Sequence, residues 1–344
     1  MNAARTRSGA HRAAGLTLVE LLLALALSLL LMAGVATLFA ASKRTYRLQE
    51  AAARVHENGR HAVNLLLREL RGAGYAGCAS APARPLVNQF SATYPLDDAH
   101  LSLPVDGFEH TGAGSWAPPL SARFPAGDAP APTRGDVLTL RGARGAAARV
   151  VGHADAGSPL QTVGYDDVRA DGPVLVADCR DVSVFAAAGD PHATGGVVGH
   201  DLGDLGKSYA GGELVPLGAT SYFVRDGSWG EPALFRRRFG GQTAEELVEG
   251  IEDLQVLYGL DRDDDGAPDE YLTAQAVVAA VAWPRVRSVR VAVMARSRPG
   301  VVDPPQTYTP LATGSTDRPA PTTGAAGRLR HPFVATVALR NRLP

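Results

Sequence analysis

The stretch GLTLVELLLALALSLLLMAGVATLFAA, residues 15–41, decides the fold of this 344-residue chain. Its only charged residue is Glu20, and it is long enough to form a membrane-spanning helix, which needs about 20 apolar residues. Residues 1–14 carry three arginines and no acid, so the positive-inside rule predicts a cytoplasmic N-terminus. We therefore expect the bulk of the chain to lie outside the cytoplasm.

Glu20 stands in the first apolar turn, where a carboxylate is costly unless it is paired. If a protease cut after Gly15, the new α-amino group of Leu16 would lie four residues before Glu20 in the same helix and would supply a cation. An ordinary signal peptide cut near Ala40-Ala41-Ser42, or an uncleaved signal anchor, is the alternative. Neither alternative explains an acid at position 20.

The helix is predicted to continue beyond the membrane segment, because residues 43–71 contain no proline and are rich in helix formers. Small or apolar residues recur there at spacings of four and three: Leu48, Ala52, Val55, Gly59, Ala62 and Leu66. We predict one helix from Leu16 to Arg71, with residues 16–41 in the membrane or a filament core. Residues 42–71 form its amphipathic continuation, which packs on a globular domain of residues 72–344.

At its N-terminus the chain resembles the type IV prepilins, which have a basic leader, a glycine before the cut, a retained apolar helix and glutamate as its fifth residue. The resemblance implies that prepilin peptidase removes residues 1–15 by cleaving between Gly15 and Leu16. It also implies methylation of Leu16 and a role for Glu20 in the register of subunits during assembly. Leu16 departs from the family, in which phenylalanine is usual at this place.

The helix exit RELRGAGYAGC, residues 68–78, resembles that of PilW-type minor pilins, and residues 176–185 and 247–261 resemble the same family. The resemblance implies a structural, non-enzymatic protein that takes part in type IV pilus (fimbrium) assembly or priming. Its implied partners are other minor and major pilins, prepilin peptidase and the inner-membrane assembly platform. The implied location is the inner membrane, with a single pass and the globular domain in the periplasm.

The globular domain is predicted to be rich in β-strands. Residues 79–135 are rich in proline, glycine, alanine and serine, and we predict a long irregular excursion there. Short β-rich stretches between turn signals follow at residues 136–140, 173–179, 221–224, 233–238, 286–295 and 333–339. Together with the helix they predict an α+β fold, in which an antiparallel sheet packs against the second half of the helix, as in pilins.

The chain has two cysteines, Cys78 and Cys179, in no metal-ligand spacing. In an oxidising periplasm an even count favours one disulfide between them. Two buried unpaired thiols are the alternative.

The acidic run DRDDDGAPDE, residues 261–270, is the one metal-like pattern in the sequence. Asp261, Asp263 and Asp265 followed by a glycine resemble the start of an EF-hand loop, in which alternating carboxylates surround a calcium ion. Asp269 or Glu270 is a further ligand in this interpretation. Leu272, however, stands where a full EF-hand has a bidentate glutamate, and a solvated acidic hairpin tip explains the run as well.

Other classes of function find less support in the sequence. The formal net charge of −1 gives no basic field for nucleic acid, so we expect no nucleic-acid partner. No hydrolase, zinc-protease or phosphate-loop motif is present, so we expect no enzyme and no cofactor other than calcium. A type II secretion pseudopilin and a calcium-dependent adhesin at a pilus tip remain as alternatives to the minor pilin.

Overall fold

The computed structural model describes residues 17–75, 77–78, 87–89, 103–120, 124, 131–238, 243–303, 305–309, 322–323 and 327–342. The predicted leader, residues 1–15, and the predicted cleavage positions Gly15 and Leu16 lie outside the described residues. Two compact units divide the chain, residues 1–50 and residues 51–344.

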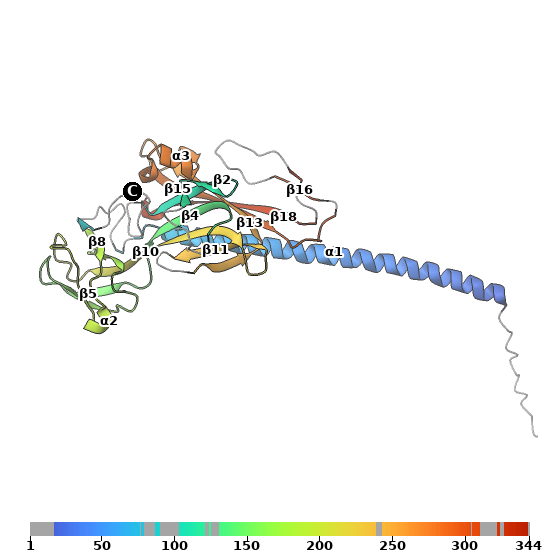
Figure 1. The fold of residues 1–344 in the computed structure, drawn as a ribbon, viewed down its shortest axis with the longest axis horizontal. Coiled ribbons are helices and arrows are strands. Elements are labelled where there is room, and N and C mark those ends of the chain that lie inside the picture. Colours follow the sequence, from blue (N-terminus) through green and yellow to red (C-terminus); the bar gives the residue numbers. More distant parts are fainter. Residues whose placement is uncertain are drawn as a thin grey trace, which may run out of the picture. The chain divides into compact units, whose positions relative to one another are not determined.

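The long helix α1 runs from Leu18 to Gly72 without interruption (Figure 1). It extends one residue past the predicted end at Arg71, and Gly74, with a φ of +73°, then turns the chain away. Residues 18–50 belong to the first unit and residues 51–72 to the second.

The second unit is built on two main β-sheets. In the described part of the chain the larger has twelve strands: β1 (Val87–Asn88), β2 (Val105–Gly112), β3 (Ser115–Ala117), β4 (Arg134–Ala143), β5 (Ala148–Gly152), β6 (Leu160–Val163), β7 (Pro173–Ala177), β8 (Val182–Ala186), β9 (Val197–Val198), β10 (Glu213–Asp226), β11 (Pro232–Arg238) and β12 (Glu245–Glu249). Its central path runs β1-β8-β7-β10-β4-β2-β3. All its pairings are antiparallel except that of β1 with β8.

The smaller sheet has the order β14-β13-β15-β18 and is antiparallel throughout. Its strands are β13 (Ile251–Leu260), β14 (Glu270–Leu272), β15 (Val286–Arg296) and β18 (Arg330–Ala338). Short elements complete the unit: helices α2 (Pro191–Thr194) and α3 (Ala274–Ala279), 3-10 turns η2 (Trp283–Arg285) and η3 (Arg340–Arg342), and the β16 (Thr307–Tyr308) and β17 (Thr322–Thr323) pair.

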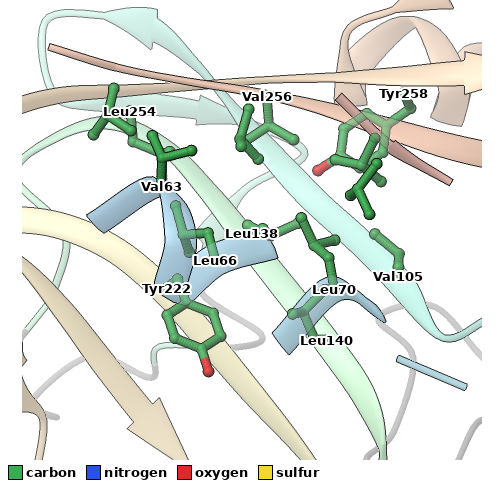
Figure 2. Packing of buried hydrophobic residues seen from close by; sticks show 14 of the residues in the cluster. Val63, Leu66, Leu70, Val105, Leu138, Leu140, Tyr222, Leu254, Val256 and Tyr258 are labelled. Atoms are coloured by element: carbon green, nitrogen blue, oxygen red, sulfur yellow. The ribbon is translucent and has the colours of Figure 1, made fainter. Parts of the chain in front are cut away.

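The main hydrophobic core lies where α1 meets both sheets. Val63, Leu66 and Leu70 of the helix pack with residues of β2, β4 and β10 from the large sheet and of β13 from the small one (Figure 2). These strands present apolar side chains inward at alternate positions, and the helix presents them every three or four residues, so one contiguous core forms. The predicted α+β fold, with a β-rich domain on the second half of the helix, is confirmed.

A second, smaller core lies under β5, β6 and β9 and includes Val150, Leu160, Phe185 and Tyr209. The fourteen-residue strand β10 connects the two cores, since its first residues pair with β5 and β7 and its later ones with β4 and β11. One long strand therefore ties the peripheral strands to the main body.

All six predicted strands are present, but the prediction of an irregular excursion over residues 79–135 is wrong in part. Strands β2 and β3 lie within it, and β2 pairs with β4 and β3 near one end of the central path of the large sheet. The first five residues of β2 are buried on both faces, so they lack the alternation that reveals a strand in a sequence.

Candidate functional site

The N-terminal part of α1 presents an apolar surface all around the helix. Its leucines, valines and phenylalanine from Leu18 to Phe39 are all at least half exposed within the described chain. The helix is long and apolar enough to cross a membrane by length and composition. A surface of this size must be covered by lipid or by other apolar helices.

Glu20 caps the start of this helix together with Thr17. The Glu20 Oε2 atom accepts hydrogen bonds from the Thr17 backbone N–H (3.0 Å) and hydroxyl (2.9 Å), and the Glu20 N–H donates to Thr17 Oγ1 (3.2 Å). This reciprocal arrangement is a capping box. Its signature, a threonine three residues before a glutamate, is present in the sequence, but we did not predict the cap from it. The predicted partner of Glu20, the amine of Leu16, lies outside the described residues.

The second part of α1 is bound tightly to the β-sheets. Val55, Ala62 and Leu66 are buried as the stripe predicts, whereas Leu48 at its start is 41 % exposed. Gly59 meets the ring of Phe333 in β18 so closely that an added Cβ would lie 2.1 Å from Phe333 Cε2. A glycine in the helix therefore makes room for an aromatic side chain from the C-terminal strand.

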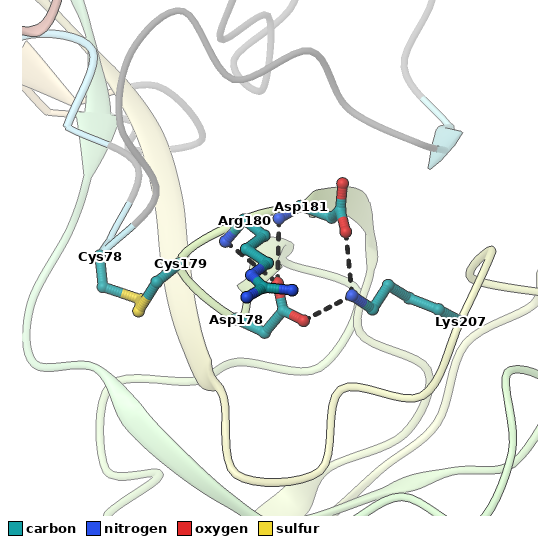
Figure 3. Close-up of a disulfide and its surroundings, with 6 residues drawn as sticks. All are labelled: Cys78, Asp178, Cys179, Arg180, Asp181 and Lys207. Carbon is teal, nitrogen blue, oxygen red and sulfur yellow. Dashed lines mark hydrogen bonds and ion pairs between the residues drawn. A yellow bond between two sulfur atoms is a disulfide. The ribbon is translucent and has the colours of Figure 1, made fainter.

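The helix exit is fixed by hydrogen bonds and by a disulfide. The Gly74 N–H donates to the Arg141 carbonyl oxygen of β4 (2.7 Å), and the Asn341 side chain donates to the Ala73 carbonyl oxygen (2.9 Å). Cys78 and Cys179 are joined by a disulfide between residues 101 apart in the sequence (Figure 3). This is the bridge that the even cysteine count favours.

The loop that carries Cys179 is held by a small charged cluster, also drawn in Figure 3. Lys207 Nζ lies 2.6 Å from Asp178 Oδ2 and 2.9 Å from Asp181 Oδ2, while Asp178 Oδ1 accepts the Asp181 N–H at 2.9 Å. Hydrogen bonds to the two carboxylates raise the pKa of Lys207, so its charge persists at neutral pH. The cluster orients the turn between β7 and β8, to which the disulfide attaches.

Buried carboxyl groups join the two sheets. Asp136 of β4 is buried, and its two oxygens accept the His110 N–H of β2 (2.8 Å) and the Val256 N–H of β13 (2.9 Å). Burial raises the pKa of Asp136 well above its usual value and raises the pKa of Glu109, in β2, to about 7. The Asp136 carboxyl group thus bridges the large sheet and the small one, which no sequence pattern reveals.

A fully buried ion pair supports the same region. Arg141 Nη2 of β4 lies 2.9 Å from Asp106 Oδ2 of β2, and neither side chain is exposed. Arg141 Nη1 also donates to the Leu103 carbonyl oxygen (3.1 Å). Removing one partner of such a pair leaves an uncompensated buried charge, so we interpret the pair as structural.

The acidic run forms the loop of the β13–β14 hairpin. One carboxylate oxygen each from Asp261, Asp263 and Asp265 lies within 4.8 Å of the other two. Asp261 is buried, and the other two aspartates are exposed. Asp269 is not a member of this group, and its Oδ2 atom instead accepts the Arg262 N–H at 2.7 Å. Three of the four predicted ligands are therefore brought together.

Backbone donors shape this loop around the carboxylates. The Gly266 N–H donates to Asp261 Oδ2 (3.0 Å), and the Ala267 N–H donates to Asp265 Oδ1 (2.7 Å). Gly266 has a φ of +88°, as the turn requires. Arg287 of β15 also contacts the loop, since its Nε donates to Asp261 Oδ2 (3.1 Å). No sequence pattern predicts this contact, because the two residues are 26 positions apart.

Comparison with known proteins gives one family match. Residues 221–341 match the family model described as type IV pilus-assembly protein W. Among solved structures, a type IV-like pilin, TTHA1219 from Thermus thermophilus, aligns with 12 % identity and a TM-score of 0.35, over 85 % of this chain and 99 % of that chain. No curated protein matches the chain.

The matched residues begin within β10 and extend through β18 into η3, so they include the acidic loop and the strand that contacts Gly59. The resemblance stated for residues 247–261 lies within this region, and it is confirmed there. Over residues 221–341, the chain is similar to the type IV pilus-assembly protein W family.

Proposed function

We propose that this chain is a minor pilin that is anchored in the inner membrane and takes part in assembling or priming a type IV pilus. The observation that carries the proposal is the division of the single helix α1. Its residues from Leu18 to Phe39 are exposed and apolar, while the same helix from Val55 to Leu70 is part of the core of the globular unit. Such a helix can anchor a subunit in a membrane before assembly and can then pack against the helices of other subunits.

We further propose that prepilin peptidase cleaves between Gly15 and Leu16, that Leu16 is then methylated, and that the globular unit lies in the periplasm. The basic residues 1–14 and the apolar segment support this orientation. In this proposal the protein is structural and has no enzymatic activity. Its partners are other minor pilins, the major pilin and the inner-membrane assembly platform.

The processing step is tested by the mass and N-terminal sequence of the full-length protein recovered from membranes with and without the peptidase. We expect a start at Leu16, one methyl group heavier, only when the peptidase is present. An intact Met1, or a start near Lys43, in the presence of the peptidase contradicts the proposal.

A second experiment separates an assembly role of Glu20 from its capping of α1. Glu20→Gln keeps a side chain able to serve in the capping box but removes the charge, whereas Thr17→Val keeps the charge and removes the capping partner. We expect Glu20→Gln to abolish or strongly reduce pilus assembly in a complementation assay and Thr17→Val to retain most of it. Loss of assembly in Thr17→Val with assembly retained in Glu20→Gln would show that the cap, and not the charge, matters.

A type II secretion pseudopilin would have the same leader. It differs from a minor pilin in the assembly that it joins, a secretion system instead of a pilus. The match of residues 221–341 to a pilus-assembly family favours the pilus. Deletion of the gene should therefore remove pili and leave type II secretion intact, and loss of secretion with pili intact would favour the pseudopilin.

A further inference from the structure

We propose that Asp261, Asp263 and Asp265 bind one calcium ion in the loop of the β13–β14 hairpin. The grouping of three acids does not by itself establish a site, because exposed acidic clusters are common. We infer the site from one buried oxygen atom of Asp261, from the chemistry of the donor atoms around it, and from the charge beside them.

Asp261 is the last residue before the loop leaves the core, and its side chain has no exposed surface. Its Oδ2 atom accepts hydrogen bonds from Gly266 and from Arg287. Its Oδ1 atom is buried and has no hydrogen-bond partner in the described part of the chain. A buried acceptor without a partner is costly, so a cation bound at this oxygen would stabilise the folded loop.

Two further carboxylates lie beside that of Asp261. One carboxylate oxygen each of Asp263 and Asp265 lies within 4.8 Å of a carboxylate oxygen of Asp261. Both of these side chains are exposed, so they add acceptor atoms on the solvent side of the loop.

The donor atoms specify the kind of cation. All three are carboxylate oxygens, which suit hard cations rather than zinc, copper or iron, and no histidine or cysteine belongs to the group. Calcium binds oxygen at about 2.3–2.6 Å, so oxygens on opposite sides of one ion lie roughly 4.6–5.2 Å apart, which the observed spacing allows. Calcium also accepts irregular sets of six to eight ligands, and water can complete this set at the open side of the loop.

Arg287 limits the affinity. Its guanidinium group contacts Asp261 and also lies 3.5 Å from Asp264 Oδ1, so it partly neutralises the loop before any cation binds. Leu272 supplies no carboxylate where the tightest loops have one. We therefore expect a Kd on the order of 10⁻⁴–10⁻³ M, the range of extracellular calcium modules. A site with this Kd is occupied by calcium only if the globular unit lies outside the cytoplasm. That location rests on the proposed function, whereas the ability of the loop to bind calcium does not.

The test is calorimetric titration of the full chain in detergent with calcium chloride, after chelator treatment, with magnesium chloride in parallel. The ligand variants are Asp263→Asn and Asp265→Asn, both at exposed positions, so the fold should survive. The matched control is Asp264→Asn, which removes the same charge from the same loop at a residue outside the group. Asparagine tolerates the Asp264 φ of +63°.

We expect Asp263→Asn and Asp265→Asn each to weaken calcium binding about 10-fold or more, and Asp264→Asn to weaken it less than about threefold. Equal weakening in all three variants would show only attraction to an acidic tip and would overturn the site. No heat of calcium binding up to about 10 mM, well above the expected Kd, would overturn it too. Equal binding of magnesium would overturn the assignment to calcium.

Discussion

The contact between Gly59 of α1 and Phe333 of β18 allows a direct test of how the helix is held on the globular unit. A Cβ atom at Gly59 would lie 2.1, 2.3 and 2.7 Å from Phe333 Cε2, Cδ2 and Cζ. The Phe333 ring also contacts the His331 ring at 4.9 Å and the His56 ring at 5.8 Å, centroid to centroid. Gly59→Ala must therefore push Phe333 aside or lift the helix.

Two opposing contributions determine how Gly59→Ala changes the free energy of unfolding. Replacing glycine by alanine inside a helix favours folding by about 1 kcal/mol. Carbon atoms pack at about 3.5–4.0 Å, so the ring has to retreat by about 1.4 Å, and overpacking of this kind costs about 1–3 kcal/mol. We expect a net loss of about 1 kcal/mol in the free energy of unfolding.

The assay is urea unfolding of the full chain in detergent for Gly59→Ala, Phe333→Ala and the double variant. Once the ring is removed, only the helix term remains, so Gly59→Ala should stabilise the Phe333→Ala protein by about 0.5–1 kcal/mol. A change of sign between the two backgrounds is the expected signature. If Gly59→Ala stabilises both proteins equally, Phe333 does not pack on the helix and the reasoning is refuted.

Three further predictions address other features. The double variant Cys78→Ser and Cys179→Ser should lose roughly 3–5 kcal/mol of unfolding free energy, because the disulfide closes a loop of about 100 residues. An unchanged urea midpoint would contradict this prediction. Burial raises the pKa of Glu109 from about 4.5 to about 7, so the folded chain keeps a proton that the unfolded chain has lost between these values, and stability should fall as pH rises through that window. In the Glu109→Gln variant this fall in the free energy of unfolding should be smaller by about 1–2 kcal/mol, allowing for solvent screening, and the free energy of unfolding at pH 4 should change little. Equal effects of the substitution at pH 4 and pH 8 would exclude titration of Glu109 as the cause. Arg287→Gln should tighten calcium binding several-fold, because the guanidinium group beside Asp261 opposes a cation; weaker binding in a folded variant would show that Arg287 instead positions the aspartate.

Local patterns of residues could be read from the sequence, and long-range contacts could not. The apolar run and the three-and-four spacing predict α1, and the β-rich stretch at residues 286–295 predicts β15, because each pattern belongs to a single element. The buried part of β2 shows no alternation, so that strand was missed. Thr17 was missed for another reason, since its signal was present but Glu20 was assigned a different partner.

The candidate site shows the same limit. The spacing of Asp261, Asp263 and Asp265 predicts their grouping, because a tight loop brings alternate residues together. The contribution of Arg287 and the burial of Asp261 depend on the pairing of β13 with β15, which joins residues far apart in the sequence. The Asp136 bridge to Val256 spans 120 residues and leaves no local trace.

The disulfide at the helix exit also decides how the chain transmits a pulling force. A tension applied along α1 reaches Cys78 only a few residues after the helix ends, and the bridge carries it directly to Cys179, between β7 and β8. Residues 79–178 are then a covalent side loop that need not bear the load. Stretching the oxidised protein by its ends should therefore never extend those residues, whereas the reduced protein gains their full contour length.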